Sequence, residues 1–296
     1  MFTNAPAMVE NRIRSFPINL KSYGLRYYSA AFGLIPYYIS QPGIIFDNDD
    51  FFGFEKPFPN GTNWEYIARV TQFAAMLFQL RNEPGFGEIC RRLATRNLKQ
   101  AHSELSAAAI LFQHDLVVDA RPEIGVAKRD FDFSVSKLGN SINVEVWMSE
   151  RKQFDEQVLL SRLNDKRKQL PADAPAVLMC IFPEHWHNQV EGLNFRFDHV
   201  TEKFFRGTSR INFVVYVHEE VWDDEATGGG YLTTNAYAIP HPNPRHPNSY
   251  LIETLLKGPN AHNEIEQFIA SPKTVNTRQS HDEFHRWVNW LIDGAI

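Results

Sequence analysis

The segment DFDFSVSKLGNSINVEVWM, from Asp130 to Met148, constrains the fold more than any other part of the chain. Aromatic and β-branched residues alternate with polar ones on both sides of Gly139-Asn140, and this period of two is typical of β-strands. Gly139-Asn140 between the two runs predicts a hairpin turn. Because successive side chains of a strand point to opposite faces, one face of the hairpin is apolar and the other is acidic.

The acidic face carries Asp130, Asp132 and Glu145. Acidic side chains usually face water, so a solvated surface is the ordinary interpretation. The alternative is a group of carboxylates that converge on a cation. A turn at Gly139-Asn140 would place Asp132 nearly opposite Trp147, one step from Glu145, but alternation puts both aspartates on the same face. We expect Glu145 and at least one aspartate to lie close together in a cleft open to solvent.

Composition indicates a globular protein without a membrane segment. The chain has 296 residues, 43% hydrophobic and 22% charged, which suits one large domain or two. A net charge of −5 argues against a phosphate-binding surface over the whole molecule, although a local basic cleft is compatible with it. No run of about 18 apolar residues occurs, and the N-terminus lacks the pattern of a signal peptide. We therefore expect a cytoplasmic protein.

The order of elements predicts a mixed sheet that contains a hairpin and a crossover helix. We divide the chain into an N-terminal extension (1–97), mostly helical after residue 60, a core (98–220) and a C-terminal extension (221–296). Before residue 60 we expect irregular structure or short strands, for example at Leu34–Ser40 and Gly43–Phe46. The expected helices are 63–81, 86–96, 98–112, 155–169, 196–206 and 282–293, and the expected strands outside the hairpin are 116–119, 177–182, 211–217 and 232–239.

Glu104 lies on the helix that precedes the first strand of the core, beside small alanines that allow a helix to approach a sheet closely. A helix with a glutamate, a three-stranded meander with acids on its second and third strands, a helix and a further strand together resemble the PD-(D/E)XK nuclease superfamily, over about residues 98–217. The resemblance implies an α/β fold of the mixed-sheet α+β kind, with a restriction-endonuclease-like αβββαβ core. It also implies metal ligands, namely Asp132 or Asp130, Glu145, Glu104 and the backbone carbonyl of Val146.

The chemistry that the resemblance implies is metal-dependent hydrolysis of phosphodiester bonds. Mg²⁺ or Mn²⁺ prefers carboxylate oxygens and, when bound, lowers the pKa of a water ligand and neutralises charge on phosphoryl oxygens. Glu104, Asp132 and Glu145 would be the catalytic acids. The sequence departs from the family at Trp147, where the family has a lysine, and an indole cannot activate water.

Lys166 is our candidate replacement for that lysine. It falls within the apolar stripe of helix 155–169, so it is expected to project toward the sheet; the alternative is that its ammonium group extends to the edge of the helix and into water. Arg162 and Gln169 flank the same face and, with Trp147, are candidate substrate contacts.

We therefore expect a deoxyribonuclease, of the endonuclease type that the superfamily includes, acting on DNA or also on RNA. A second hypothesis is a catalytically inactive nuclease fold that binds nucleic acid or a protein, which the tryptophan at position 147 favours. A third is an unrelated mixed fold with a solvated acidic face. The terminal extensions are candidates for contact with a second copy of the chain or with a protein partner.

Overall fold

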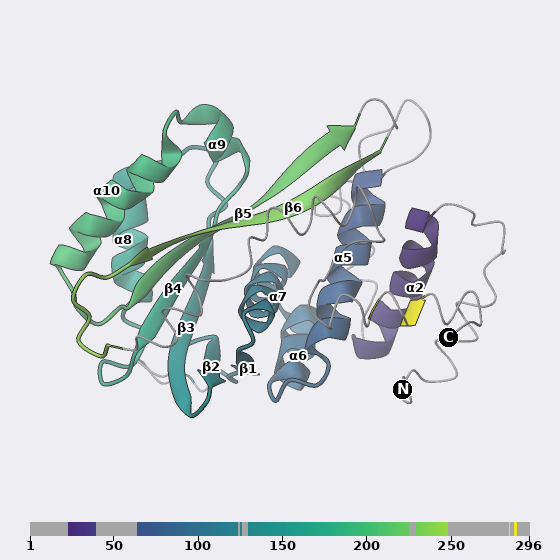
Figure 1. Ribbon diagram of the computed structural model, residues 1–296, viewed down its shortest axis with the longest axis horizontal. Helices are drawn as coiled ribbons and strands as arrows, with labels where there is room; N and C mark the ends of the chain where they lie inside the picture. Colours follow the sequence, from purple (N-terminus) through teal and green to yellow (C-terminus); the bar gives the residue numbers. More distant parts are fainter. Residues whose placement is uncertain are drawn as a thin grey trace.

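The computed structural model describes residues 23–39, 64–123, 125, 130–224, 229–247, 284 and 287–288. Over these residues the protein is a mixed α/β fold built on one six-stranded sheet, in which the strands lie side by side in chain order (Figure 1). β1, β2 and β3 pair antiparallel in turn, β4 pairs parallel with β3, β5 pairs parallel with β4, and β6 pairs antiparallel with β5. The strands are β1 (Val117–Ala120), β2 (Phe133–Lys137), β3 (Asn140–Met148), β4 (Ala176–Ile181), β5 (Phe213–Asp224) and β6 (Gly229–Pro240).

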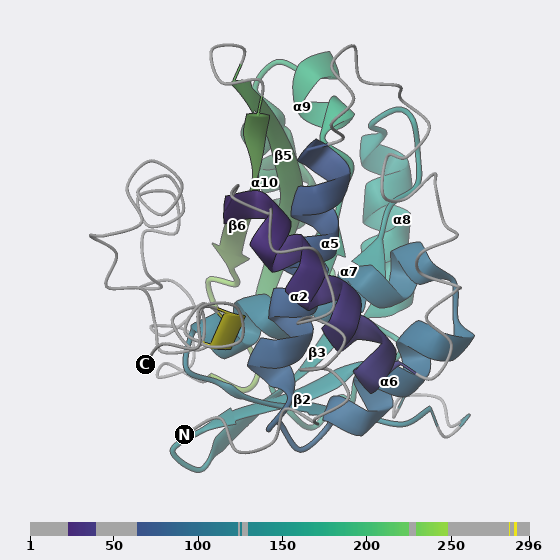
Figure 2. The ribbon, with the colours of Figure 1, turned by 90° about the vertical axis from the view of Figure 1, so that its right-hand side faces the viewer.

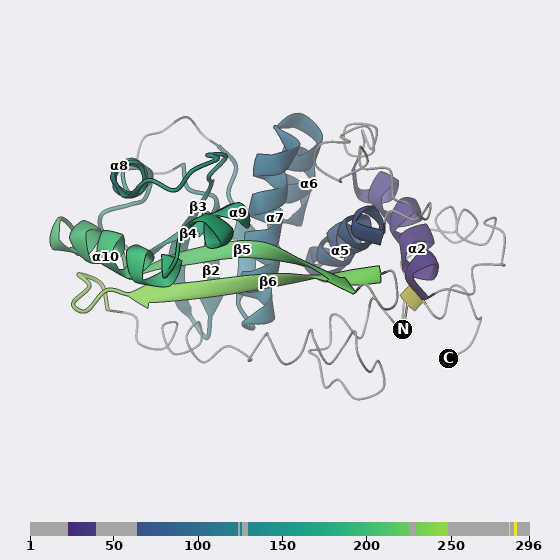
Figure 3. The same ribbon diagram turned by 90° about the horizontal axis from the view of Figure 1, so that it is seen from above.

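Helices cover both faces of this sheet (Figures 1 and 3). The alternation of apolar residues along β3, β4 and β5 explains the two layers, because each strand contributes to one hydrophobic cluster on either side. One face packs against α2 (Tyr23–Tyr38), α5 (Trp64–Leu80), α6 (Phe86–Thr95) and α7 (Leu98–Gln113). The other packs against α8 (Glu156–Lys166), α9 (His185–Gln189) and α10 (Leu193–Arg206).

The hairpin between β2 and β3 turns one residue earlier than the sequence predicts. Lys137 pairs with Asn140, so Leu138 and Gly139 form the two-residue loop, with φ angles of 50° and 80°. Two consecutive positive φ angles are typical of the type I′ turn, whose twist matches that of the strands. The prediction of a turn at Gly139-Asn140 was wrong because both registers keep the same residues on the apolar face, so alternation cannot distinguish them.

This register decides which residues of the hairpin meet. Phe133, the first residue of β2 that pairs with β3, lies opposite Val144. The predicted register, which put Asp132 nearly opposite Trp147, was therefore wrong by two residues. Asp132, just before this pair, accepts a hydrogen bond from the backbone N–H of Val146, the residue after Glu145.

We predicted irregular or extended structure at Leu34–Ser40. For the described residues of this segment the prediction was wrong, because residues 34–38 belong to helix α2. Ala30, Ala31, Leu34 and Ile35 are all buried, and this spacing is that of one face of a helix. The tyrosines and Pro36 of this helix favoured the wrong prediction. The strand predicted at Gly43–Phe46 lies outside the described residues.

The N-terminal helices and the sheet share one hydrophobic core, which runs from α2 through α5, α6 and α7 to the strands. Figure 2 shows α2 in front of α5, on the side of the molecule away from α10. Residue 221, where we placed the start of a C-terminal extension, lies within β5, which continues to Asp224 and pairs with β6. Of the predicted helix 282–293, the structure describes Phe284, Trp287 and Val288, which are helical and buried in this core; its other residues lie outside the described part.

In the part of the chain that the structure describes, no helix combines the length and the apolar character that crossing a membrane requires.

Candidate functional site

Asp132 lies where β2 and β3 cease to pair, and both of its carboxylate oxygens are held. Oδ2 accepts a hydrogen bond from the backbone N–H of Val146 at 2.8 Å. Oδ1 accepts one from Nη1 of Arg92 at 3.2 Å. These contacts belong to Asp132 and not to Asp130, which is half-buried two residues earlier. The structure thus selects Asp132 as the aspartate that joins the second and third strands.

Glu104 contributes a second buried carboxylate from α7. Its Oε2 accepts a hydrogen bond from Nη1 of Arg92 at 2.8 Å, and its Oε1 accepts one from Nη1 of Arg96 at 2.9 Å. Ala101 and Ala108 on the same helix are buried in the core with the sheet residues. Their small side chains bring α7 close to the strands, so Glu104 is enclosed although it sits on the flank of an apolar stripe.

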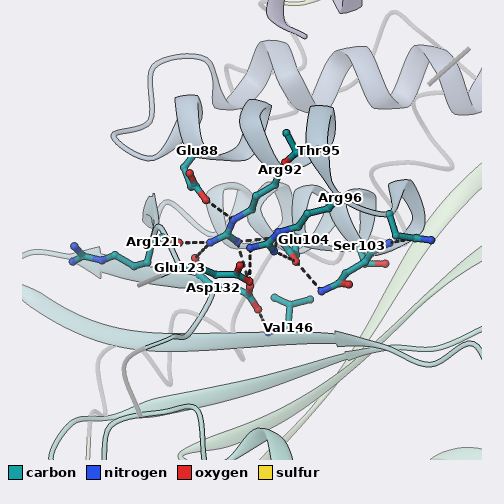
Figure 4. A network of polar contacts seen from close by, with 12 residues as sticks. Glu88, Arg92, Thr95, Arg96, Ser103, Glu104, Arg121, Glu123, Asp132 and Val146 are labelled. Atoms are coloured by element: carbon teal, nitrogen blue, oxygen red, sulfur yellow. Dashed lines mark hydrogen bonds and ion pairs between the residues drawn. The ribbon is translucent and has the colours of Figure 1, made fainter. Parts of the chain in front are cut away.

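Arg92 is the centre of this network, as Figure 4 shows. Its side chain is only 2% exposed and forms ion pairs with Glu88, Glu104 and Asp132, while Nη2 also donates to the carbonyl oxygen of Arg121. Burial lowers the pKa of this guanidinium, but the charges of Glu104 and Asp132 outweigh that effect and raise the pKa above its ordinary value. The arginine is therefore a permanent buried cation between two acids.

Arg92 was not among the predicted site residues, because residues 1–97 were placed outside the core. A signal was present, however. Arg92 lies between Ile89 and Leu93 on the buried side of an amphipathic helix, and a cation in an apolar stripe is the same pattern that pointed to Lys166.

Glu145 and Lys166 form the second half of the site. Lys166 lies at the end of α8, and its Nζ donates to Oε1 of Glu145 at 2.6 Å and to Oε1 of Gln169 at 3.2 Å. It therefore reaches the sheet, as its place in the stripe predicts. Glu145 is 3% exposed, and within the described part of the chain its Oε2 is buried without a hydrogen-bond partner.

The electrostatics of the site follow from crowding of acids in a poorly hydrated space. Burial, and next the charge of Glu104, raise the pKa of Asp132 to about 6, although Arg92 and Lys166 act in the opposite direction. Burial, and next the charge of Asp132, raise the pKa of Glu145 well above its ordinary value, against the pull of Lys166. The expected exposure to solvent is wrong for Glu145, which is 3% exposed, whereas Asp132 is half-buried with 13% of its side chain exposed.

The remaining sequence candidates lie apart from the acids. Arg162 is exposed on α8 and makes no contact with the site among the residues that the structure covers. Trp147 is half-buried and packs against the hydrophobic cluster under α8 and α10. An indole is stabilised by such packing, which explains why the position holds an apolar side chain in this chain.

Whether these residues suit a metal ion depends on their chemistry and their present partners. Asp132, Glu104 and Glu145 supply the oxygen ligands that Mg²⁺ prefers, and the unpartnered Oε2 of Glu145 is a ready acceptor for a cation. Among the described residues, however, there is no group of three or more histidine, cysteine, aspartate or glutamate side chains whose arrangement could hold a metal ion. Arg92 and Lys166 neutralise the acids instead. Asp132 and Glu145 thus have the donor atoms that a divalent cation prefers, but Arg92 and Lys166 would have to release these oxygens for the cation to bind.

The raised pKa of Glu145 predicts an unusual pH dependence of stability without metal. The folded state holds the proton more tightly than the unfolded chain, whose carboxyl titrates near 4.5. Stability is therefore lost as the pH rises above that value. Each unit by which the folded pKa exceeds the unfolded one costs about 1.4 kcal/mol.

Glu145→Gln removes this loss, because an amide does not ionise. We expect the free energy of unfolding of Glu145→Gln to exceed that of the wild type by an amount that grows from pH 4 to pH 8, as measured by urea denaturation in EDTA. Glu150→Gln, at an exposed position just after β3, is the matched control and should show no such trend. A gap that stays constant or shrinks with pH would contradict the raised pKa of Glu145.

Comparison of the chain with protein-family models, with curated proteins and with solved structures finds no match in any of the three. The PD-(D/E)XK resemblance therefore rests on the order of the elements and on the residues described above, and the identity of the fold family stays a prediction.

Proposed function

We propose that the protein is a metal-dependent nuclease with a restriction-endonuclease-like core, which hydrolyses phosphodiester bonds in DNA. The observation that carries the proposal is the contact of Lys166 with Glu145, next to Asp132 on the neighbouring strand. Two acids from adjacent strands and a lysine from the following helix are the parts that such hydrolysis needs. The antiparallel β1–β3 meander, the α8 crossover and the parallel strand β4 also agree with the αβββαβ order.

In this proposal Asp132 and Glu145 hold Mg²⁺ or Mn²⁺, and Glu104 adds a ligand or holds the neighbouring side chains. When bound, the ion lowers the pKa of its water and neutralises charge on the phosphate. The N–H of Val146 fixes Asp132 on the strand edge, which keeps the carboxylate oriented. Lys166 orients the attacking water or stabilises the phosphoryl oxygens, the role that Trp147 cannot fill.

One observation favours the inactive binding module as a second candidate. Arg92 already pairs with Asp132 and Glu104, and a permanent cation beside these acids competes with a metal ion for them. An intact buried ion-pair network of this kind serves a purely structural role equally well.

Metal-dependent melting separates the two candidates without relying on activity. A cation that binds only the folded state raises the melting temperature by mass action. We expect Mg²⁺ and Mn²⁺ to raise the melting temperature of the wild type by several degrees. The melting temperature of Glu145→Gln should not change on addition of either ion, because this variant lacks one charged ligand. NaCl at matched ionic strength controls for general salt effects.

Cleavage itself is tested on plasmid, single-stranded DNA and RNA with both metals. We expect cleavage by the wild type and none by Glu145→Gln. A wild type that neither cleaves any substrate nor responds to either metal in melting would favour the inactive module.

A further inference from the structure

A second feature of interest is a hollow of about 590 Å³ on the side of the sheet covered by α8 and α10. It lies where both helices end and where the chain leaves β6. Its charged lining includes Arg167, Arg206, Arg210 and Arg245, and none of the described residues that line it is acidic. Four arginines around one hollow are unexpected in a chain with a net charge of −5.

Part of this cluster has a structural role. Arg167 donates from Nη1 to the carbonyl oxygen of Gly207 at 3.1 Å, just after α10. Arg210 donates from Nη2 to the carbonyl oxygen of Leu170, just after α8. Cations are favoured at helix C-termini because of the helix dipole. Each of these bonds uses one of the five N–H donors of a guanidinium, and the Nε atoms of both arginines are buried without a partner among the described residues.

Among the described residues, few carboxylates balance the charge of these arginines. Over the described ranges, Arg167, Arg210 and Arg245 form no ion pair with a carboxylate, and Arg206 has only an exposed contact with Glu202 at 3.8 Å. Burial, and then the charges of Arg167 and Arg245, lower the pKa of Arg210. The guanidinium groups therefore repel one another, and an anion bound between them would relieve this repulsion.

The loops that carry these arginines are tied together before any ligand arrives. The backbone N–H of Arg245 donates to the carbonyl oxygen of Ser209 at 2.7 Å. Nδ1 of His241 accepts from the N–H of Asn243 at 2.9 Å, so its Nε2 donates to the carbonyl oxygen of Thr208 at 2.8 Å. The imidazole thus holds the two loops together. A preformed arrangement of donors lowers the entropic cost of binding.

We propose that this hollow binds the phosphate group of a phosphorylated ligand or of a nucleic-acid backbone. The planar guanidinium matches phosphate oxygens through pairs of hydrogen bonds, and Ser209 and Asn243 in the lining add neutral polar groups. A volume of about 590 Å³ exceeds the needs of one phosphate and lies in the range of small-molecule sites. The inference does not depend on nuclease activity, since none of the proposed catalytic residues lines the hollow.

The test uses a double variant, Arg206→Gln with Arg245→Gln, because both side chains are exposed and neither makes a hydrogen bond that ties the described fold together. The matched control is Arg91→Gln with Arg151→Gln, two exposed arginines outside the hollow, which changes the net charge by the same amount. The probes are inorganic phosphate, deoxyadenosine 5′-monophosphate and a short single-stranded oligonucleotide without terminal phosphates. Binding is measured by calorimetry in EDTA and phosphate-free buffer, so that no cleavage occurs.

We expect the wild type to bind at least one probe, the double variant to bind it about tenfold or more weakly, and the control to bind it as the wild type does, because charge-assisted hydrogen bonds to phosphate are lost only in the first variant. Binding of the monophosphate alone would identify a small phosphorylated ligand, and binding of the oligonucleotide would identify backbone phosphates; either supports the proposal. Absence of binding to all three probes, or equal weakening in both variants, would overturn it.

Discussion

Lys166→Met is expected to reduce metal-dependent DNA cleavage by about a hundredfold or more, the usual effect of removing one group that stabilises charge in the transition state. Methionine keeps the apolar stem that packs in the stripe of α8 and removes only the ammonium group. Glu145 then loses its 2.6 Å partner, but its oxygens remain available to a cation. We therefore expect the metal-induced rise in melting temperature to persist while cleavage is lost.

Lys168→Met is the matched control for this variant. Lys168 is exposed, follows Lys166 by two residues and pairs with Asp165 at 2.8 Å, away from the site. Its replacement should leave cleavage unchanged. Lys166→Arg, which keeps a cation, should retain part of the activity and shows whether charge or shape matters. Equal cleavage by the wild type and Lys166→Met would show that the lysine expected at position 147 has no replacement on α8.

Much of the fold was predictable because its strongest local patterns agree with the packing. Alternation defined β2 and β3, and the apolar run after residue 175 defined β4. The position of Lys166 in the apolar stripe of α8 predicted that its side chain projects toward the sheet, and it contacts Glu145 of β3. In each case the side chains that the pattern places together are buried together, so the local and the tertiary preferences do not conflict.

The rest of the site could not be read from the sequence, for physical reasons. Two hairpin registers that differ by two residues bury the same face, so only the backbone of the loop at Leu138 and Gly139 decides which residues of β3 lie near Asp132. The depth of burial of these acids depends on α6, a helix that precedes the core in the chain. Whether an acidic face meets water or a helix is a tertiary property that alternation does not encode.

Arg92→Met is expected to lower the free energy of unfolding by about 3–5 kcal/mol, the cost typical of removing one member of a buried ion pair. The loss arises because the largely buried Asp132 loses its cation and the buried Glu104 keeps only Arg96. Arg91→Met is the matched control: the neighbouring arginine is 51% exposed and pairs only with Glu88 among the described residues, so its loss should cost less than about 1 kcal/mol. Urea denaturation of both variants in EDTA measures the difference.

The same variant tests whether the acids can hold a metal. If Asp132, Glu104 and Glu145 accept a divalent cation, Mg²⁺ or Mn²⁺ should restore part of the stability that Arg92→Met loses, and should do so more strongly than in the wild type, where the guanidinium competes for the same carboxylates. A variant that is strongly destabilised and indifferent to both metals would mean that these acids serve the fold through Arg92 alone. A loss as small as that of Arg91→Met would instead mean that the buried network contributes little to stability.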